Sequence, residues 1–195
     1  SVFSNGQILQ FWYKKEVLIN MNKFKENINS FILPIVIILA LSLTRLIPHP
    51  WNFSPMLAVG VFSGFYFRQF YLSLFVVIFS MFIGDLFLGF HSLMFFTYVA
   101  LAIAVLIGLC VKHFKFTEVL YSGLASSVCF FIITNFGAWL THGEMYAKNF
   151  SGLMQSYVMA IPFFQNTLIS TFLYLLLFKL LFDLAVKKKI FKTSF

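Results

Sequence analysis

Six long apolar runs, separated by short polar breaks, account for most of this 195-residue chain. They cover residues 30–47, 54–67, 70–84, 91–111, 118–141 and 157–183. Most are close to the ~20 residues that a helix needs to cross the hydrocarbon core of a bilayer. Charged residues make up only 10% of the chain, whereas a soluble domain carries about a quarter. The sequence therefore predicts a single-domain, all-α integral membrane protein.

The second run is the shortest, and it decides the number of membrane spans. Residues 54–67 would form a helix of only ~21 Å, against a hydrocarbon core of ~30 Å. Lysine and arginine in short loops stay on the cytoplasmic side, so their distribution separates six spans from five. With six spans, twelve of the 14 basic residues lie on one side and only Arg45 and Lys148 on the other; with five, the division is nine against five. The charges favour a six-helix bundle with both termini in the cytoplasm.

Two features of this short run bear on how it packs. Gly60 and Gly64 form a GxxxG spacing, which either allows close helix contact or arises by chance in an apolar helix. Arg68, at the end of the run, can extend its guanidinium to the membrane interface. Local thinning of the bilayer can absorb the remaining mismatch in length.

The charged ends divide the chain into three parts. Residues 1–29 are expected to form a cytoplasmic N-terminal segment, and on one reading residues 1–20 are an extension ahead of an ordinary-looking start at Met21. Residues 30–184 hold the six helices, and residues 185–195 form a basic cytoplasmic tail. The first apolar run has no cleavage site of a secretory signal after it. The expected location is the inner (plasma) membrane of a cell.

The net charge of +8 lies in the segments between apolar runs, so it indicates membrane topology and not nucleic-acid binding. Cys110 and Cys129 fall in runs that we expect to be separate helices, which makes them free thiols on this interpretation. Asp183 follows Lys179 by four residues, a spacing that indicates an ion pair near a helix end.

Under the six-span topology the other polar residues gather at the outer side of the membrane. Charged groups near hydrocarbon are costly unless they are paired or line a wet cavity, so Asp85 and Arg45 are functional candidates. A structural ion pair between them is the alternative. Asn135 either bonds between helices or binds a ligand. Trp139 belongs either to the interfacial aromatic belt or to the wall of a binding site.

Signatures of metal binding and of catalysis are weak or missing. His49, His91 and His142 are expected on the outer side, and histidine with carboxylate is a ligand set for transition metals. Their spacing, however, matches no metal motif. Neither the HExxH pattern of metalloproteases nor the GxSxG pattern of serine hydrolases occurs. We therefore expect a protein that is not an enzyme and that holds no cofactor or metal.

Four separated motifs give the chain a resemblance to a known family. They are Asn52-Phe53-Ser54-Pro55-Met56-Leu57-Ala58; Gly84-Asp85-Leu86 with Gly89; Thr134-Asn135-Phe136-Gly137-Ala138-Trp139-Leu140; and Gly152-Leu153 with Ala160-Ile161-Pro162-Phe163-Phe164-Gln165-Asn166-Thr167-Leu168. Over roughly residues 30–182 the chain resembles a family of bacterial membrane proteins described as a domain of unknown function and as transport proteins. That family is similar, more distantly, to the substrate-binding S components of energy-coupling factor vitamin transporters.

The resemblance to S components implies a small six-helix protein that binds its ligand near the outer face. It also implies an energising ABC-type module as a partner. S components dock that module through an AxxxA pattern on the first helix, and the nearest spacing here is Ala40 with Thr44.

The leading hypothesis is a membrane transport protein, either a substrate-capture subunit or a small solitary transporter. Its partners would be the lipid bilayer and a small solute such as a vitamin or its precursor. A ligand pocket combines apolar walls with a few polar groups. The residues expected to bind the solute are Asn52, Asp85, Asn135, Trp139, Gln165 and Asn166. The alternative is a non-transporting membrane scaffold of the envelope or cell-shape machinery, in which the same motifs only pack helices.

Overall fold

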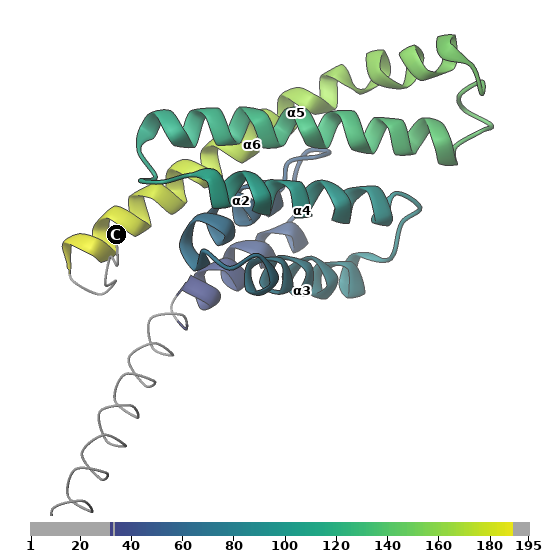
Figure 1. Ribbon diagram of the computed structural model, residues 1–195. Helices are drawn as coiled ribbons and strands as arrows, with labels where there is room; N and C mark the ends of the chain where they lie inside the picture. Colours follow the sequence, from purple (N-terminus) through teal and green to yellow (C-terminus); the bar gives the residue numbers. More distant parts are fainter. Residues whose placement is uncertain (1–31, 33, 189–195) are drawn as a thin grey trace, which may run out of the picture.

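The computed structural model describes residue 32 and residues 34–188, and this part of the chain is helical without any strand (Figure 1). The predicted segment 1–29 and most of the predicted tail, 185–195, lie outside the described residues. The all-α prediction is confirmed for the part that is described. The elements are an apolar helix, Pro34–Leu46, that ends in the 3-10 turn η1 (Leu43–Leu46), followed by α2 (Met56–Phe67), α3 (Phe70–Leu88), α4 (Met94–Cys110), α5 (Phe116–Thr141) and α6 (Phe150–Lys187).

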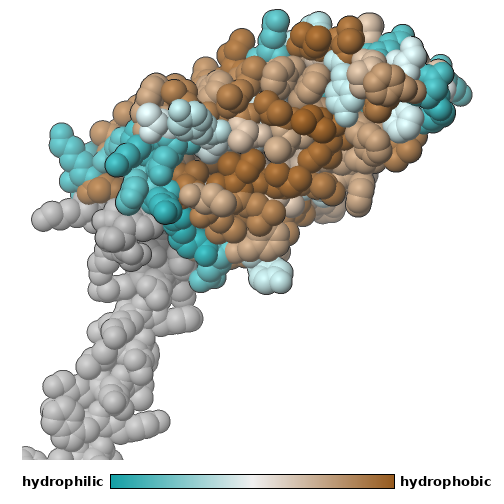
Figure 2. Space-filling view, turned by 45° about the horizontal axis from the view of Figure 1, so that its top comes forward, coloured by the Kyte–Doolittle hydropathy of each residue, from teal (hydrophilic) through white to brown (hydrophobic). Residues whose placement is uncertain are grey.

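Three of these helices are long and apolar enough to cross a membrane, namely α3, α5 and α6. The first helix, α2 and α4 are apolar but shorter. Figure 2 shows apolar side chains across much of the visible face, with hydrophilic ones toward the two ends. Large exposed side chains such as Tyr71 and Phe75 are common on this exterior. Such a surface would aggregate in water and is suited to lipid.

The loops follow from residues that cannot continue a helix. Pro48 and Pro50 lie in the segment after η1, and Pro55 is the N-cap of α2, where a missing N–H costs nothing. Gly89 ends α3 with a φ of 91°, a conformation that favours glycine. α3 therefore continues to Leu88, four residues beyond the predicted end of its apolar run.

The predicted start of the last helix was wrong. The apolar run begins at residue 157, but α6 begins at Phe150 and has 38 residues, a length of ~57 Å. Asn149 caps this start, because its side chain accepts a hydrogen bond from the backbone N–H of Gly152 at 2.9 Å. The helix also continues through Pro162. The first turns of α6, residues 150–156, mix apolar and polar side chains, so hydropathy alone did not mark this start.

The short helix α2 lies in the middle of the bundle and contacts α3, α4, α5 and α6. Figure 1 shows α5 and α6 on one side of α2 and α4, and α3 with the first helix on the other. Every residue of α2 except Tyr66 is buried. A helix enclosed in this way is apolar all round, and its length is not set by the bilayer.

The GxxxG spacing of α2 forms a close contact with α4. A Cβ atom added at Gly64 would collide with the backbone oxygen of Val105, and one added at Gly108 would collide with the backbone oxygen of Val61. One turn away, a Cβ at Gly60 would lie 2.9 Å from the Cβ of Ala104. The two backbones therefore touch along a line of small residues. The GxxxG spacing is a helix-packing contact in this structure and not a chance pattern. We call this contact the α2–α4 seam.

Aromatic rings fill the bundle beside the C-terminal half of α2. Phe62 stacks on Phe178 with ring centroids 4.4 Å apart, and Phe65 stacks on Phe114 at 4.5 Å. Phe182 meets Phe65 edge to face at 5.3 Å. Stacked and edge-to-face pairs each add about 0.5–1.5 kcal/mol beyond area burial. This end of the bundle is solid.

The basic residues of the described part mostly lie at this solid end, near the α4–α5 connection and the end of α6. Arg68 donates hydrogen bonds to the backbone oxygens of Leu109 (3.2 Å) and Lys112 (2.8 Å). The guanidinium thus satisfies carbonyls where α4 ends. We call this the basic end; it carries Arg68, Lys112, Lys115, Lys179, Lys187 and Lys188.

Candidate ligand pocket

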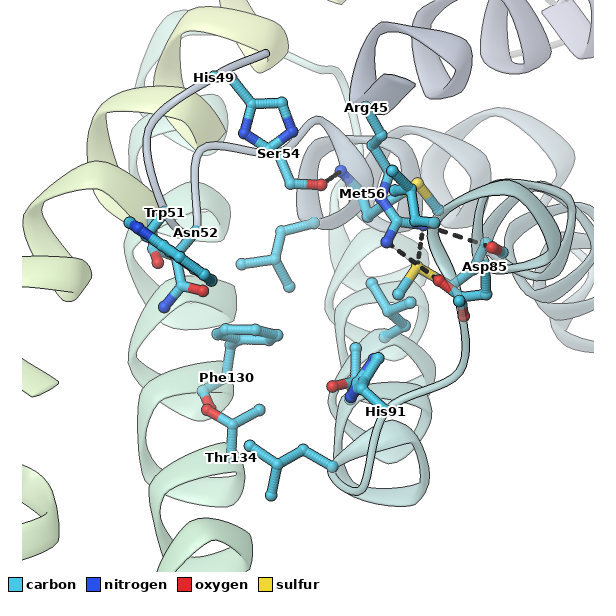
Figure 3. Close-up of a pocket in the computed structure, with 18 of the residues that line it drawn as sticks. Arg45, His49, Trp51, Asn52, Ser54, Met56, Asp85, His91, Phe130 and Thr134 are labelled. Carbon is cyan, nitrogen blue, oxygen red and sulfur yellow. Dashed lines mark hydrogen bonds and ion pairs between the residues drawn. The ribbon is translucent and has the colours of Figure 1, made fainter. Parts of the chain in front are cut away.

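A cavity of about 550 Å³ opens at the end of the bundle opposite the basic end. Its lining comes from η1 and the segment after it, the start of α2, the end of α3, the start of α4, the middle of α5, and Thr167 of α6. Figure 3 shows Phe130 and Thr134 of α5 on one side and Arg45 with Asp85 on the other. Apolar walls with a few convergent polar groups, at a volume between ~300 and ~1,000 Å³, are typical of small-molecule sites.

An ion pair forms one wall of this pocket. Arg45 Nη2 lies 3.1 Å from Asp85 Oδ1, and the side chain of Asp85 is only 1% exposed. The other carboxylate oxygen of Asp85 accepts a hydrogen bond from the hydroxyl of Tyr98 at 2.8 Å. Arg45 Nη1 contacts the backbone oxygen and the sulfur of Met81, at 3.3 and 2.8 Å. The pair joins the first helix, α3 and α4 at the pocket.

Gly84 makes room for this arrangement, because a Cβ at that position would lie 2.8 Å from Arg45 Nη1. The sequence left open whether Asp85 and Arg45 are paired, and in the structure they are. A buried pair is costly to break, by about 3–5 kcal/mol when one partner is removed, because the other charge is left uncompensated. Both residues also line the pocket, so the structural role does not remove them from the candidate site.

The segment between η1 and α2 lines one side of the pocket and is held there by α6. Asn166 Nδ2 donates a hydrogen bond to the backbone oxygen of Trp51 at 3.0 Å. The ring of Phe53 packs edge to face on Tyr174, with centroids 6.4 Å apart. Asn52 has a φ of 60°, a left-handed conformation that asparagine tolerates better than most residues. We call residues 47–55 the pocket loop.

Three of the six predicted ligand-binding residues line the pocket: Asn52, Asp85 and Asn135. The other three do not. Asn166 instead anchors the pocket loop. Gln165 is exposed on α6. Trp139 lies at the α5–α6 connection, where its Nε1 donates to the backbone oxygen of Ala147 at 2.9 Å and the ammonium of Lys148 sits 5.4 Å from its ring centroid.

Of the three candidate histidines, two line the pocket and one does not. His49 and His91 line the pocket, and His49 Nδ1 lies 2.9 Å from the backbone oxygen of Pro50. His142 lies at the end of α5, with its Nε2 3.2 Å from the hydroxyl of Ser92. Within residue 32 and residues 34–188, no group of three or more histidine, cysteine, aspartate or glutamate side chains is placed to hold a metal ion.

Sequence reasoning missed four hydroxyl residues that line the pocket: Ser54, Thr97, Thr134 and Thr167. Serine and threonine in an apolar run bond to their own helix and leave little trace in hydropathy. Thr134 donates to the backbone oxygen of Phe130 at 2.8 Å in this way. For Thr134 and Thr167 the available signal was their position in the motifs, because Thr134 precedes Asn135 and Thr167 follows Asn166.

Comparison with known proteins gives one match. The family described as "Family of unknown function (DUF6580)" matches residues 25–193, which includes all of the described helices. No curated protein and no solved structure matches the chain.

Proposed function

Starting from a chain that belongs to the family of unknown function DUF6580, we propose that this protein captures a small solute in the membrane, as a substrate-binding subunit or a small solitary transporter. The observation that supports this proposal is the pocket itself. It is about 550 Å³ in volume, and a buried ion pair, two amides and several hydroxyls converge on it between apolar walls. A scaffold whose motifs only packed helices would gain nothing from a cavity at that place, since cavities cost stability.

The proposal includes six membrane spans, with both termini in the cytoplasm and the pocket open to the outer side of the inner (plasma) membrane. The segregation of charge supports this orientation: the basic end carries six lysines and arginines of the described part, while Arg45 and Lys148 lie toward the pocket end. Cytoplasmic loops are enriched in such residues. The length of α2 does not contradict six spans, because this helix is enclosed by protein and need not match the lipid.

Orientation can be tested with single cysteines after Cys110 and Cys129 are replaced. A cysteine at Asn52 in the pocket loop, and one at Ala147 in the α5–α6 connection, should react with an impermeant thiol reagent added outside intact cells. A cysteine at Lys188 should react only after the membrane is opened. Labelling of Lys188 from outside would exclude the proposed topology.

Solute capture can be tested by thermal shift on purified full-length protein with a broad panel of metabolites, followed by pocket variants. Thr97→Phe places a ring in the pocket at a half-buried position with no hydrogen bond to another side chain in the described structure. Val99→Phe adds the same ring on the exposed side of the same helix and is the matched control.

A ligand that binds the pocket should stabilise wild-type protein and Val99→Phe but not Thr97→Phe, by mass action on the folded state. If no compound stabilises the wild type, or if Thr97→Phe responds as the wild type does, solute capture is wrong and the scaffold reading replaces it.

An ABC-type energising module would be the partner of a capture subunit. The Ala40 and Thr44 spacing gives this partner little support, because Thr44 Oγ1 lies 3.0 Å from the hydroxyl of Tyr174 and so faces α6, while Ala40 is exposed. Copurification of an ATPase with the tagged protein from mild detergent would favour the subunit. Uptake of the ligand by vesicles that contain this protein alone would favour the solitary transporter.

A further inference from the structure

The polar side chains on the α5 and α6 side of the pocket each donate one hydrogen bond to their own helix. Thr134 Oγ1 donates to the backbone oxygen of Phe130 at 2.8 Å, and Thr167 Oγ1 donates to the backbone oxygen of Phe163 at 3.2 Å. Asn135 Nδ2 donates to the backbone oxygen of Phe131 at 2.7 Å.

A hydroxyl whose single hydrogen is used can only accept further hydrogen bonds. Thr134 and Thr167 therefore present lone pairs, and the amide oxygen of Asn135 has no partner among the described residues. Three side chains therefore offer acceptor oxygens on this side of the pocket, and the second N–H of the Asn135 amide remains beside them as a donor; we call this side the acceptor wall.

The opposite wall has the reverse character. Both carboxylate oxygens of Asp85 are occupied, one by Arg45 and one by Tyr98. Its negative charge is already balanced by Arg45, so Asp85 offers little net attraction to a second cation. A guanidinium carries five N–H groups, and the Nε of Arg45 has no partner among the described residues. The wall formed by Arg45 and Asp85 therefore still offers an N–H donor, while the two formal charges of the pair neutralise each other.

The lining also includes apolar side chains, Leu57, Leu101 and Phe130 among them, and further polar ones from the pocket loop and the start of α4. A carboxylate ligand would bring only acceptors to the acceptor wall, and it would compete with Asp85 for Arg45 at the cost of a buried ion pair. An ammonium ligand would find acceptors on one side but a guanidinium, and no free carboxylate, on the other.

We propose that the pocket takes an uncharged ring compound with N–H or O–H donors on one edge and a carbonyl or ring-nitrogen acceptor on the other, such as a cyclic amide or an amide-substituted heterocycle. This inference rests on the proposed function and adds the chemical class of the solute. Donors of the ligand meet Thr134, Asn135 and Thr167, its acceptor meets Arg45, and its faces lie against the apolar lining.

Two sets of three compounds test the class on full-length protein by titration calorimetry. Uracil is neutral with N–H donors, 1,3-dimethyluracil lacks the donors, and orotate adds a carboxylate. Nicotinamide, its N,N-dimethyl form and nicotinate vary the same features on another ring. In at least one set, the neutral donor-bearing member should bind about tenfold or more tighter than both of the others, because removal of the donors leaves the acceptor wall unpaired.

Variants then assign the contact. Thr134→Val and Thr167→Val keep the side-chain shape but remove the accepting oxygen, so each should weaken binding of the neutral compound about tenfold. Thr141→Val is the matched control, because Thr141 makes the same bond to its own helix, to the backbone oxygen of Gly137 at 2.8 Å, but does not line the pocket. It should leave affinity unchanged. Melting temperatures of all three variants separate lost contacts from lost folding.

Tighter binding by a carboxylate or by a dimethylated member would overturn the assigned class, and so would the absence of binding by every member of both sets. Unchanged affinity in both threonine variants would overturn it as well. Solute capture survives each of these results if the broad panel yields any ligand that Thr97→Phe blocks, so the two proposals fail separately.

Discussion

The same two helices enclose the pocket at one end and touch each other at the other. Met56 and Leu57 of α2 and Leu101 of α4 line the pocket, whereas about two turns further along Gly64 and Gly108 bring the two backbones into contact. The α2–α4 seam has no free volume, and the pocket has about 550 Å³. Residue size along one helix pair therefore decides where the bundle is solid and where it opens.

Small residues at the seam and polar residues at the pocket hold the helices together in different ways, which amino-acid composition alone does not distinguish. Small residues at the seam hold the helices together by van der Waals contact, the main source of helix association in lipid. Polar residues at the pocket hold the helices together through an ion pair and hydrogen bonds, and leave other polar atoms without partners. The following substitutions test that division, in order of decreasing expected effect.

The largest effect is expected from Gly64→Leu at the seam. A Cβ at this position already meets the backbone oxygen of Val105, and backbone cannot move aside as a flexible side chain can. The cost should exceed the ~1–3 kcal/mol typical of overpacking, because the two helices must separate. The measurement is the yield of monodisperse protein from membranes. Ala125→Leu, which introduces the same side chain at an exposed position of α5, should keep the wild-type yield. Equal yields of both variants would show that the seam tolerates separation.

The next effect is expected from the ion pair at the pocket. Asp85→Leu leaves the guanidinium of Arg45, itself only 12% exposed, without its partner, and should lower stability by about 3–5 kcal/mol. Arg45→Met should do the same from the other side. The double variant should recover part of the loss, which detergent melting of the four proteins of this cycle measures. Strictly additive losses would show that the two charges do not stabilise each other.

A smaller effect is expected where α6 holds the pocket loop. Asn166→Ala removes the hydrogen bond to the backbone oxygen of Trp51 and should cost about 0.5–1.5 kcal/mol. A cysteine at Asn52 should then react faster with a soluble thiol reagent. Gln165→Ala changes the neighbouring exposed amide and is the control. Equal labelling rates in the two backgrounds would mean that Asn166 does not restrain the loop.

The smallest effect is expected at the basic end. Lys179 and Asp183 form an ion pair at 2.8 Å with the predicted spacing, but Asp183 is 55% exposed. Pairs of this kind contribute about 0.3–0.5 kcal/mol. Asp183→Asn should therefore change the melting temperature far less than Asp85→Leu does, and the small change should shrink further at high salt. A loss as large as that at Asp85 would remove the contrast between buried and exposed pairs.

Hydropathy was enough to place the helices of the described part, because a membrane helix is defined by a long run of apolar residues. It failed at the start of α6, where Asn149 caps a helix whose first turns mix apolar and polar side chains. It also could not decide between chance and contact for Gly60 and Gly64, since that depends on which residues of α4 lie opposite.

The candidate site was predicted only in part, for a related reason. The position of each residue along its span predicted that Asn135, Trp139 and Asn166 lie at one level of the membrane. It could not predict which face of its helix each residue occupies. In an all-round apolar helix, no periodicity marks the inward side. Asp85 was found because a carboxylate in such a run demands a partner. Thr134 and Thr167 were missed because their hydroxyls bond to their own helices.

The enclosure of α2 has a consequence for how substitutions should be tolerated along the chain. On α3, exposed residues such as Tyr71, Phe75 and Phe79 alternate with buried ones such as Ser73 and Val76. A complete set of single substitutions, scored by protein retained in the membrane, should therefore show tolerance that rises and falls every 3.6 residues along α3. Along α2 there is no lipid-facing side to provide tolerant positions, so the profile should be uniformly low. A periodic profile on α2 would mean that lipid reaches one of its faces.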